Sequence, residues 1–379
     1  MTAVSKALVV GGGIGGLTAG IAFRRQGIAV DLVEIQSSWT VYGVGIIQPN
    51  NTLRSLDRIG LAQACVEHGA AFPGWRIHDG DGALLMEAPS TSTAAPAYPP
   101  VNGITRSTLH NILMEAAAAS GVAARLGVTI GDLRQTDTGV VVEFTDGTTG
   151  KYDLVVGADG IHSDVRKRLF GPEHGPRFTG QGVWRYNLPR PADMEWGGLY
   201  FGTDSKAGLV PLSSSLMYIF LVTAEAETAW FPPDELAERL RDRLAGYGGL
   251  VARMRPLITD ASSVVYRPMF NVMLPPPWMQ GRVVVIGDAA HATTPHLAQG
   301  AAMAVEDAVL LAELVGTGGD LPGQLETFMA RRYSRAKFVV DTSSQLAAWE
   351  LEQWRGIHNP DADPGGLLHR ATLALMDDY

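Results

Sequence analysis

Three glycines near the amino terminus, Gly11, Gly13 and Gly16, have the spacing of a loop that holds a pyrophosphate. They follow the aliphatic residues 7–10 and precede an apolar helical pattern. The first glycine permits a sharp turn, the second lets backbone approach phosphates, and the third lets the helix pack closely on the strand. The N–H groups that begin the helix would face the phosphates. This stretch predicts a dinucleotide site without deciding between NAD and FAD.

Glu34 adds an acidic group at the expected place, 18 residues after Gly16 and at the end of the next predicted strand. A carboxylate there can accept hydrogen bonds from an adenosine ribose. Residues 6–34 therefore read as strand, helix, strand, a βαβ unit of about 30 residues.

Two later aliphatic strands also end in a carboxylate. Asp159-Gly160 follows one of them, with Ser163 positioned to cap a helix, and Gly287-Asp288 follows the other. Taken singly, Asp159 could belong to a common turn and Asp288 could cap a helix. Arg106, at the start of a helical pattern capped by Thr105, could be a surface charge.

Taken together, these motifs resemble those of the single-component flavoprotein monooxygenases, the aromatic hydroxylases of the 4-hydroxybenzoate hydroxylase type. The resemblance covers nearly the whole chain and looks nearest to the urate hydroxylase and 3-hydroxybenzoate 6-hydroxylase branches. It implies tightly bound FAD, transient NADH or NADPH, and O2 as co-substrate. It also implies that a flavin C4a-hydroperoxide hydroxylates a small electron-rich aromatic or N-heterocyclic substrate.

The resemblance implies an extended FAD with contacts along most of its length. Gly13 to Gly15 would hold the pyrophosphate, Glu34 the ribose, and Asp288 the ribityl hydroxyls. The helix after Ala298 would direct N–H groups at the pyrimidine edge, where the reduced flavin is negative. The implied cofactor residues are Gly11, Gly13, Ile14, Gly15, Gly16, Glu34, Ile35, Gly45, Ile47, Gln48, Arg106, Val128, Asp159, Asp288, Pro295, Gly300, Ala301 and Ala302.

Two positions depart from the family pattern. Ala298 stands in residues 295–300 where the family often has glycine, so the loop loses freedom to adopt positive φ. Lys206 aligns with an arginine that holds the substrate in the urate hydroxylase branch. Lysine cannot make the same bidentate contact, so urate is disfavoured as the substrate.

The substrate residues are expected on the inserted sheet and in the loop before the last motif helix. His296 has an ordinary pKa near neutrality and could accept a phenol proton, although a loop histidine can also be merely polar surface. His291 is expected to be structural. The candidates for substrate binding and catalysis are Arg185, Tyr186, Lys206, Tyr218 and His296.

The sequence predicts an α/β (mixed α+β) fold with a discontinuous, Rossmann-like FAD-binding domain. This domain takes residues 1–72, 101–172 and 276–345. Residues 73–100 and 173–275 form an inserted antiparallel β-sheet substrate domain, and residues 346–379 form a helical C-terminal tail. Within these parts, helices are expected at 52–69 and 106–120, and a hairpin at Asp146-Gly147.

Composition narrows the class of protein further. The formal charge is −9 and no long basic block occurs, which argues against nucleic acid as a partner. The sole cysteine, Cys65, excludes an intramolecular disulfide, and no metal site is expected. No signal peptide or membrane-length apolar run is present, so a cytoplasmic monomer or homodimer is expected.

Other activities stay open at this level. One alternative keeps FAD and the fold but makes the protein a halogenase or a reductase. Another is an NAD-dependent dehydrogenase, which would leave the motifs at 159 and 288 without a role. A third is a flavoprotein that binds a partner without catalysis.

Overall fold

The computed structural model describes residues 4–39 and 43–379. Residues 1–3 and 40–42 belong to the first predicted FAD-domain segment and lie outside the described residues.

A six-stranded sheet forms the first layer, with its strands running parallel except at one edge. Its central strand is the aliphatic run before the glycine loop, and Ala7, Leu8 and Val9 are fully buried. Burial on both faces explains why this strand is continuously apolar. In spatial order the strands are β18 (Met279–Gln280), β19 (Val283–Val285), β12 (Leu154–Gly157), β1 (Lys6–Val10), β2 (Ala29–Glu34) and β8 (Ala123–Leu126).

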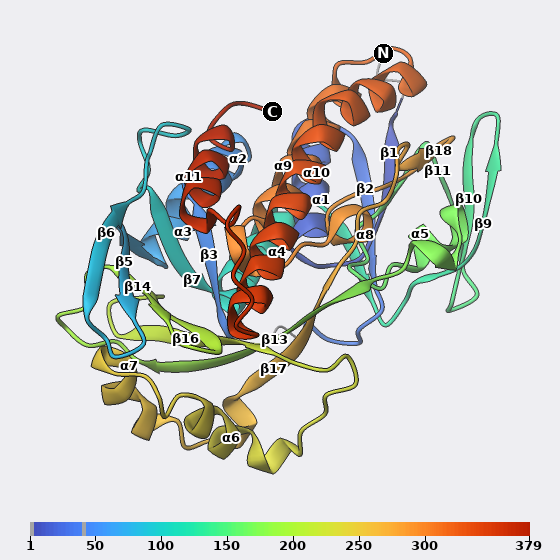
Figure 1. Ribbon diagram of the computed structural model, residues 1–379. Coiled ribbons are helices and arrows are strands. Elements are labelled where there is room, and N and C mark those ends of the chain that lie inside the picture. Colours follow the sequence, from blue (N-terminus) through green and yellow to red (C-terminus); the bar gives the residue numbers. More distant parts are fainter. Residues whose placement is uncertain (1–3, 40–42) are drawn as a thin grey trace.

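Helices pack around this sheet and share its apolar core (Figure 1). The predicted helix at 106–120 is confirmed, since the side chain of Thr105 accepts the N–H of Thr108 at 3.0 Å. The helices of this part are α1 (Ile14–Arg25), α4 (Arg106–Ala119), α5 (Asp164–Phe170), α8 (Asp288–His291) and α9 (Gly300–Gly316), with the 3-10 turns η1 (Pro172–His174) and η5 (Pro295–Leu297).

The predicted helix at 52–69 is two helices, α2 (Asn50–Arg58) and α3 (Ala62–Glu67). Gly60 has φ 79° between them, a conformation that ends a helix. Amphipathic periodicity continues across this break, which is why the sequence suggested one helix.

A seven-stranded sheet forms the second layer, below the first in Figure 1. Most neighbouring strands are antiparallel, as predicted, but β5 and β14 pair in parallel. That detail corrects the wholly antiparallel expectation. The strand order is β17 (Val265–Asn271), β13 (Arg177–Pro189), β16 (Leu216–Ala224), β15 (Ser205–Pro211), β14 (Gly197–Phe201), β5 (Gly74–Asp79) and β6 (Leu84–Pro89).

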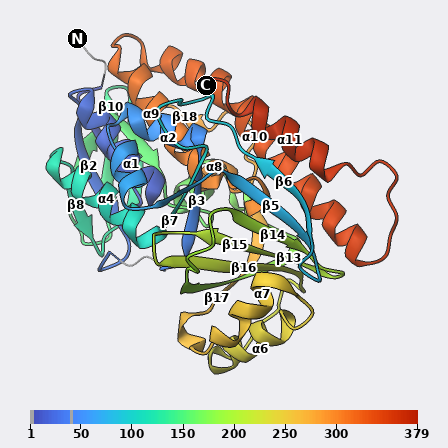
Figure 2. The same ribbon diagram turned by 90° about the vertical axis from the view of Figure 1, so that its left-hand side faces the viewer.

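One face of this second sheet is covered by short helices (Figure 2). Trp184, Tyr186 and Leu188 of β13 point to that side and belong to its apolar core. The intervening residues of β13 therefore face the opposite way. The covering elements are η2 (Pro233–Glu235), α6 (Leu236–Arg243), α7 (Gly249–Met254), η3 (Arg255–Leu257) and η4 (Ala261–Ser263).

Two three-stranded sheets complete the β-structure. One contains the predicted hairpin, with Gly147 at φ 80° in its turn. Its strands are β11 (Thr149–Tyr152), β10 (Gly139–Phe144) and β9 (Ile130–Thr136), and those of the other sheet are β3 (Gly45–Pro49), β7 (Val101–Thr105) and β4 (Ala70–Phe72).

The C-terminal part is helical, as predicted. Helix α10 (Leu321–Trp354) is 34 residues long, and α11 (Pro364–Ala374) packs on it. In Figures 1 and 2, α10 runs from beside the parallel sheet to the second sheet, where it contacts β13. The predicted domain boundaries stay a prediction, and the one at 345 falls inside this helix.

Candidate functional site

Each of the three glycines in the loop occupies a position that suits glycine for a different structural reason. Gly11 has φ 106°, and a Cβ there would lie 2.4 Å from the carbonyl oxygen of Ala158. A Cβ on Gly16 would lie 1.9 Å from the carbonyl oxygen of Gly11. A Cβ on Gly13, by contrast, would meet nothing within 4 Å. The middle glycine therefore leaves open space at the start of α1, where a pyrophosphate loop needs it.

The start of α1 is also chemically suited to an anion. No side chain caps it, and its first turn holds no acidic residue. The carboxylate of Glu34 is oriented by the N–H groups of Gly12, at 2.7 Å, and Gln36, at 2.8 Å. Next to it, Ile35 is 65% exposed, and the N–H of Val128 donates to the Glu34 carbonyl at 3.0 Å. An exposed aliphatic side chain here offers a surface for an adenine ring.

Asp288 is the first residue of α8, and Gly287 with φ 59° is the N-cap. The alternative that Asp288 serves as the helix cap is therefore wrong, because no side chain caps this helix. The Asp288 side chain can be reached by solvent, but it lies in a region where many protein atoms surround it. Those surroundings raise the pKa of its carboxyl, while the charges of His291 and Arg106 act in the opposite direction. Among residues 4–39 and 43–379 its carboxylate has no hydrogen-bond partner, so it is available to hydroxyl groups of a ligand.

Asp159 is engaged by the turn that follows it. One carboxylate oxygen accepts the N–H groups of Asp164, at 2.8 Å, and Val165, at 3.0 Å. Its other oxygen is buried without a partner in the described part of the chain. Ser163 caps α5 by accepting the N–H of Arg166 at 2.9 Å, as predicted. Asp159 thus holds the turn, and its contact with FAD stays a prediction.

The start of α9, like that of α1, has no side-chain cap. Ala298 has φ 55°, in the left-handed region, and leads through Gln299 into Gly300. No side chain caps the helix and its first turn is free of acidic residues. Ala301 and Ala302 follow, so small side chains surround the N–H groups. The uncapped starts of α1 and α9, the open space at Gly13 and the available carboxylate of Asp288 together fit FAD.

The second sheet presents Arg185 and Tyr218 on the face away from α6 and α7. The backbone of β3 packs on Tyr218 so tightly that a Cβ on Gly45 would lie 2.2 Å from its ring. Ile47 and Gln48 continue that strand. Burial raises the pKa of Tyr218 to about 12. Tyr186, also a candidate, points to the opposite face, which removes it from this group.

Arg185 is a cation with no hydrogen bond or ion pair to any residue that the structure describes. Burial, together with the nearby charge of Arg106, lowers its pKa to about 10. The charge of Arg106 also acts on Tyr218 and on Asp288, so Arg106 lies near both the sheet face and the start of α8. An unpaired guanidinium in such surroundings is costly unless a ligand supplies an acceptor.

Lys206 and His296 are brought together by a residue that the sequence did not single out. The carboxylate of Glu350, near the end of α10, accepts hydrogen bonds from the ammonium of Lys206 and from Nε2–H of His296. The bond from His296 is 3.0 Å long. The other ring nitrogen of His296 lies 2.9 Å from the hydroxyl of Thr294. In a long helical stretch Glu350 looks like any surface glutamate, so no local signal could have identified it.

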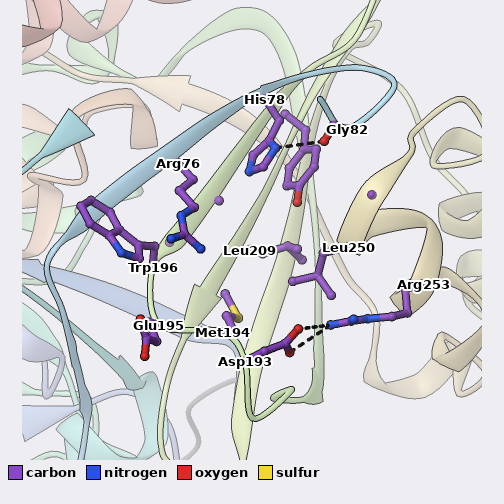
Figure 3. A pocket seen from close by; sticks show the side chains of 14 residues that line it. Arg76, His78, Gly82, Asp193, Met194, Glu195, Trp196, Leu209, Leu250 and Arg253 are labelled. Atoms are coloured by element: carbon purple, nitrogen blue, oxygen red, sulfur yellow. Dashed lines mark hydrogen bonds and ion pairs between the residues drawn. The ribbon is translucent and has the colours of Figure 1, made fainter. Parts of the chain in front are cut away.

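The structure also contains a cavity of about 250 Å³ on the opposite face of the second sheet (Figure 3). Arg76, His78, Trp196 and Arg253 line it, but Arg253 is paired with Asp193 at 3.2 Å and Arg76 with Glu87 at 3.0 Å. It is separated by the sheet from Arg185 and Tyr218 and does not belong to the site described above.

Within the described ranges no group of three or more acidic, histidine or cysteine side chains could hold a metal ion. None of the helices in the described part of the chain is long and apolar enough to cross a membrane.

Comparison with known proteins identifies the cofactor. A family model described as an FAD binding domain matches residues 4–343. The chain belongs to this FAD-binding family. The match includes the glycine loop and the strand ends at Asp159 and Asp288, and it resolves the choice between NAD and FAD in favour of FAD.

Curated relatives identify the type of enzyme. The chain is 35% identical over 347 residues to a putative FAD-dependent monooxygenase, YetM, of Bacillus subtilis, covering 91% of this chain and 94% of that protein. It is 34% identical over 358 residues to 2-heptyl-3-hydroxy-4(1H)-quinolone synthase of Pseudomonas aeruginosa, covering 90% of each. The protein is an FAD-dependent monooxygenase of the aromatic hydroxylase type.

A solved structure confirms the fold. HpxO of Klebsiella pneumoniae, complexed with FAD and uric acid, superposes with a TM-score of 0.84 at 22% identity, covering 98% of this chain and 96% of that one. The α/β architecture with its second sheet is thus also that of this FAD-binding protein.

Proposed function

We propose that the enzyme uses NADH or NADPH and O2 to hydroxylate a small electron-rich aromatic or N-heterocyclic substrate bound against the face of the second sheet. When bound, FAD supplies the redox chemistry and the activated oxygen, and the C4a route expected above is part of this proposal. The residues proposed to contact FAD are those named from the resemblance. Among them, Gly13 and Asp288 carry the clearest structural support.

The observation that supports the proposed substrate site is Arg185, which has no hydrogen bond or ion pair in the described residues and lies near Tyr218. Both lie on the sheet face that packs against β3, the strand expected along the flavin ring. A guanidinium without a partner favours a ligand with an oxygen acceptor or an ionised hydroxyl. Charge donated into the ring by such an oxygen makes a neighbouring carbon electron-rich, which is what oxygen transfer requires. Arg185 would thus orient the substrate, and Tyr218 would donate a hydrogen bond.

The remaining two candidates, His296 and Lys206, have partners within the protein. Both ring nitrogens of His296 are engaged, and the ammonium of Lys206 pairs with Glu350. Their direct contact with a substrate stays a prediction, and the proposal does not depend on it.

The test is NADH and NADPH oxidation by the purified, FAD-loaded protein in the presence of candidate substrates. The panel consists of small phenols, aminobenzoates, hydroxylated N-heterocycles and 4(1H)-quinolones, the last because of the relative named for such a product. Oxidation stimulated by a substrate, with a product heavier by one oxygen atom, supports the proposal. Stimulated oxidation with hydrogen peroxide as the sole product for every compound contradicts it.

A further inference from the structure

The carboxylate of Glu350 collects three donors from three different elements. Lys206 of β15 donates a hydrogen bond to one oxygen. His296 of η5 and Gln181 of β13 both donate to the other oxygen, at 3.0 Å. Glu350 itself comes from α10. This group, the Glu350 cluster, joins the helical part of the FAD-binding layer to the second sheet.

The cluster is buried and carries no net charge. The side chains of Lys206 and Glu350 are each 13% exposed, and that of His296 is 1% exposed. Burial and the charge of Lys206 lower the pKa of His296, so the imidazole is neutral. Burial would raise the pKa of the Glu350 carboxyl, but the charge of Lys206 and the hydrogen bonds from Lys206 and His296 outweigh it and hold that pKa at about 2. One positive and one negative charge remain, and they cancel.

Lys206 lies on the same face of the second sheet as Arg185 and Tyr218. It pairs with Val222 of β16, whereas Arg185 pairs with Phe220, two residues away on that strand. Residues two apart along a strand point to the same face and are about 7 Å apart. Arg185 and Lys206 therefore lie in adjacent rows of this face, where Arg185 has no hydrogen bond or ion pair in the described residues and Lys206 has Glu350. Arg267 of β17, which pairs with Val183, lies on the same face.

We propose that Glu350 is a specificity-determining residue. Because its carboxylate pairs with the ammonium of Lys206, Lys206 does not bind the substrate, and this end of the sheet face binds an uncharged part of the substrate. This rests on the proposed function, because it takes this face to be the substrate face. A substrate carboxylate that took Lys206 would leave Glu350 buried with only neutral donors. Breaking a buried ion pair in this way is strongly unfavourable. An acidic group of the substrate would instead be directed to Arg185.

The experiment measures binding rather than turnover, on FAD-loaded protein, by calorimetric titration. Benzoate serves as the anionic probe and benzamide as its neutral counterpart of similar shape. In Glu350→Gln, Lys206 loses its counter-charge, so benzoate affinity is expected to rise about tenfold, as for one new charge-assisted hydrogen bond. Benzamide affinity is expected to stay within about twofold. Glu352→Gln, two residues further on the same helix, is the matched control and should change neither.

The role of Lys206 is tested by a second change. In the double variant Glu350→Gln with Lys206→Gln, the gained affinity for benzoate should disappear. The double variant also replaces the buried ion pair by two neutral side chains, so its benzoate affinity should stay within about twofold of that of the unchanged protein. This comparison keeps the proposal testable if Glu350→Gln alone does not fold.

Three results would overturn the proposal: no gain of benzoate affinity in Glu350→Gln, an equal gain for benzamide, or a gain that persists without Lys206. A loss of benzoate affinity beyond about fivefold in the double variant, relative to the unchanged protein, would do the same, since Lys206 would then already be open to ligands. A specific gain in Glu350→Gln without turnover of any aromatic compound would support the role of Glu350 and count against the proposed function alone.

Discussion

At the residue scale, Gly13 is the position where cofactor binding can be separated from folding. Its φ of −75° suits any residue, and the space beside it is open. It is also the N-cap of α1, where aspartate is a favoured residue. Gly13→Asp should therefore fold with unchanged or slightly raised stability while repelling the pyrophosphate.

For Gly13→Asp we expect FAD affinity to fall at least about tenfold, equivalent to about 1.4 kcal/mol. Gly13→Asn is the control, since it has the same shape and capping ability without the charge, and it should bind FAD more tightly than Gly13→Asp. The ratio of FAD to protein after dialysis and the melting temperature of the apoprotein are the measurements. Full flavin content in Gly13→Asp would show that the phosphates lie elsewhere.

Tyr218 is the residue whose hydroxyl distinguishes a substrate contact from packing. Tyr218→Phe keeps the ring against which Gly45 packs, so FAD content should not change. With the hydrogen bond to substrate lost, kcat/KM for hydroxylation should fall about tenfold and more reducing equivalents should end as hydrogen peroxide. Tyr186→Phe, on the other face of the same sheet, should leave both quantities unchanged. Equal kinetics of the two variants would remove Tyr218 from the site.

What the sequence predicts at this scale depends on how local the interaction is. The caps Thr105 and Ser163 were predictable because each accepts from an N–H group three residues later. Glu350 was not, since its partners Lys206 and His296 are 144 and 54 residues away in the chain. Long-range pairing of this kind leaves no periodicity or motif.

At the element scale, the loop that leads into α9 combines a strained residue with an uncapped helix. The alanine at position 298 was noted in the sequence because it lacks the freedom of glycine, and it adopts φ 55° nonetheless. An alanine in the left-handed region costs roughly 1–2 kcal/mol. The helix start that is expected to face the flavin is thus held in place by the rest of the fold rather than by its own sequence.

Ala298→Gly should therefore stabilise the protein, in contrast to the usual effect of replacing alanine by glycine. Relief of the strain outweighs the added freedom of the unfolded chain, and the net gain should be about 0.5–1 kcal/mol. Denaturant unfolding of the FAD-loaded protein measures it. Ala301→Gly, in the first turn of α9 and without positive φ, is the control and should destabilise by a similar amount. Destabilisation by Ala298→Gly would refute the strain argument.

Whether a segment forms a helix or a strand was predictable where one hydrophobic periodicity runs through the whole segment. Which strands pair with one another was not predictable. The βαβ unit, the hairpin at Gly147 and α4 follow from local pattern and turn residues. The parallel pairing of β5 with β14 joins strands more than 100 residues apart and is not encoded in either strand. The break between α2 and α3 was visible as Gly60, but the apolar periodicity outweighed it.

At the scale of the whole molecule, a buried charge network connects α8, α9 and α10. Arg332 donates to Asp307 and Glu306, each at 2.7 Å, and His291 lies 2.6 Å from Asp307. The carboxylate of Asp307 also accepts the N–H of Gly287 at 2.9 Å, beside Asp288. His291 is thus structural, as expected, and the network fixes the strand end that carries the predicted ribityl contact.

This network predicts how stability depends on pH. Burial alone would raise the pKa of Asp307, but His291 and Arg332 lower it to about 2 from 3.8. A carboxyl with a lowered pKa stabilises the fold above its unfolded pKa and loses that contribution as pH falls toward the folded pKa. Stability should therefore decline between about pH 4 and pH 2, by about 2 kcal/mol from this group.

Asp307→Asn tests this directly by urea unfolding at several pH values. The variant should be less stable at pH 7, and its decline on acidification should be smaller than that of the unchanged protein by about 2 kcal/mol. Asp378→Asn, at a largely exposed carboxylate, is the comparison and should alter the decline much less. If Asp307→Asn lost stability with acid as steeply as the unchanged protein, Asp307 would not be the paired carboxylate.

The central claim is that this FAD-binding fold inserts one atom of O2 into an aromatic ring held against the second sheet. The most direct test is turnover of the best compound from the substrate panel under oxygen-18 gas, with NADH or NADPH, followed by mass spectrometry of the product. We predict a product that carries one oxygen-18 atom and forms only with FAD-loaded protein. A product whose new oxygen comes from water, or oxidation without any new oxygen, would contradict it.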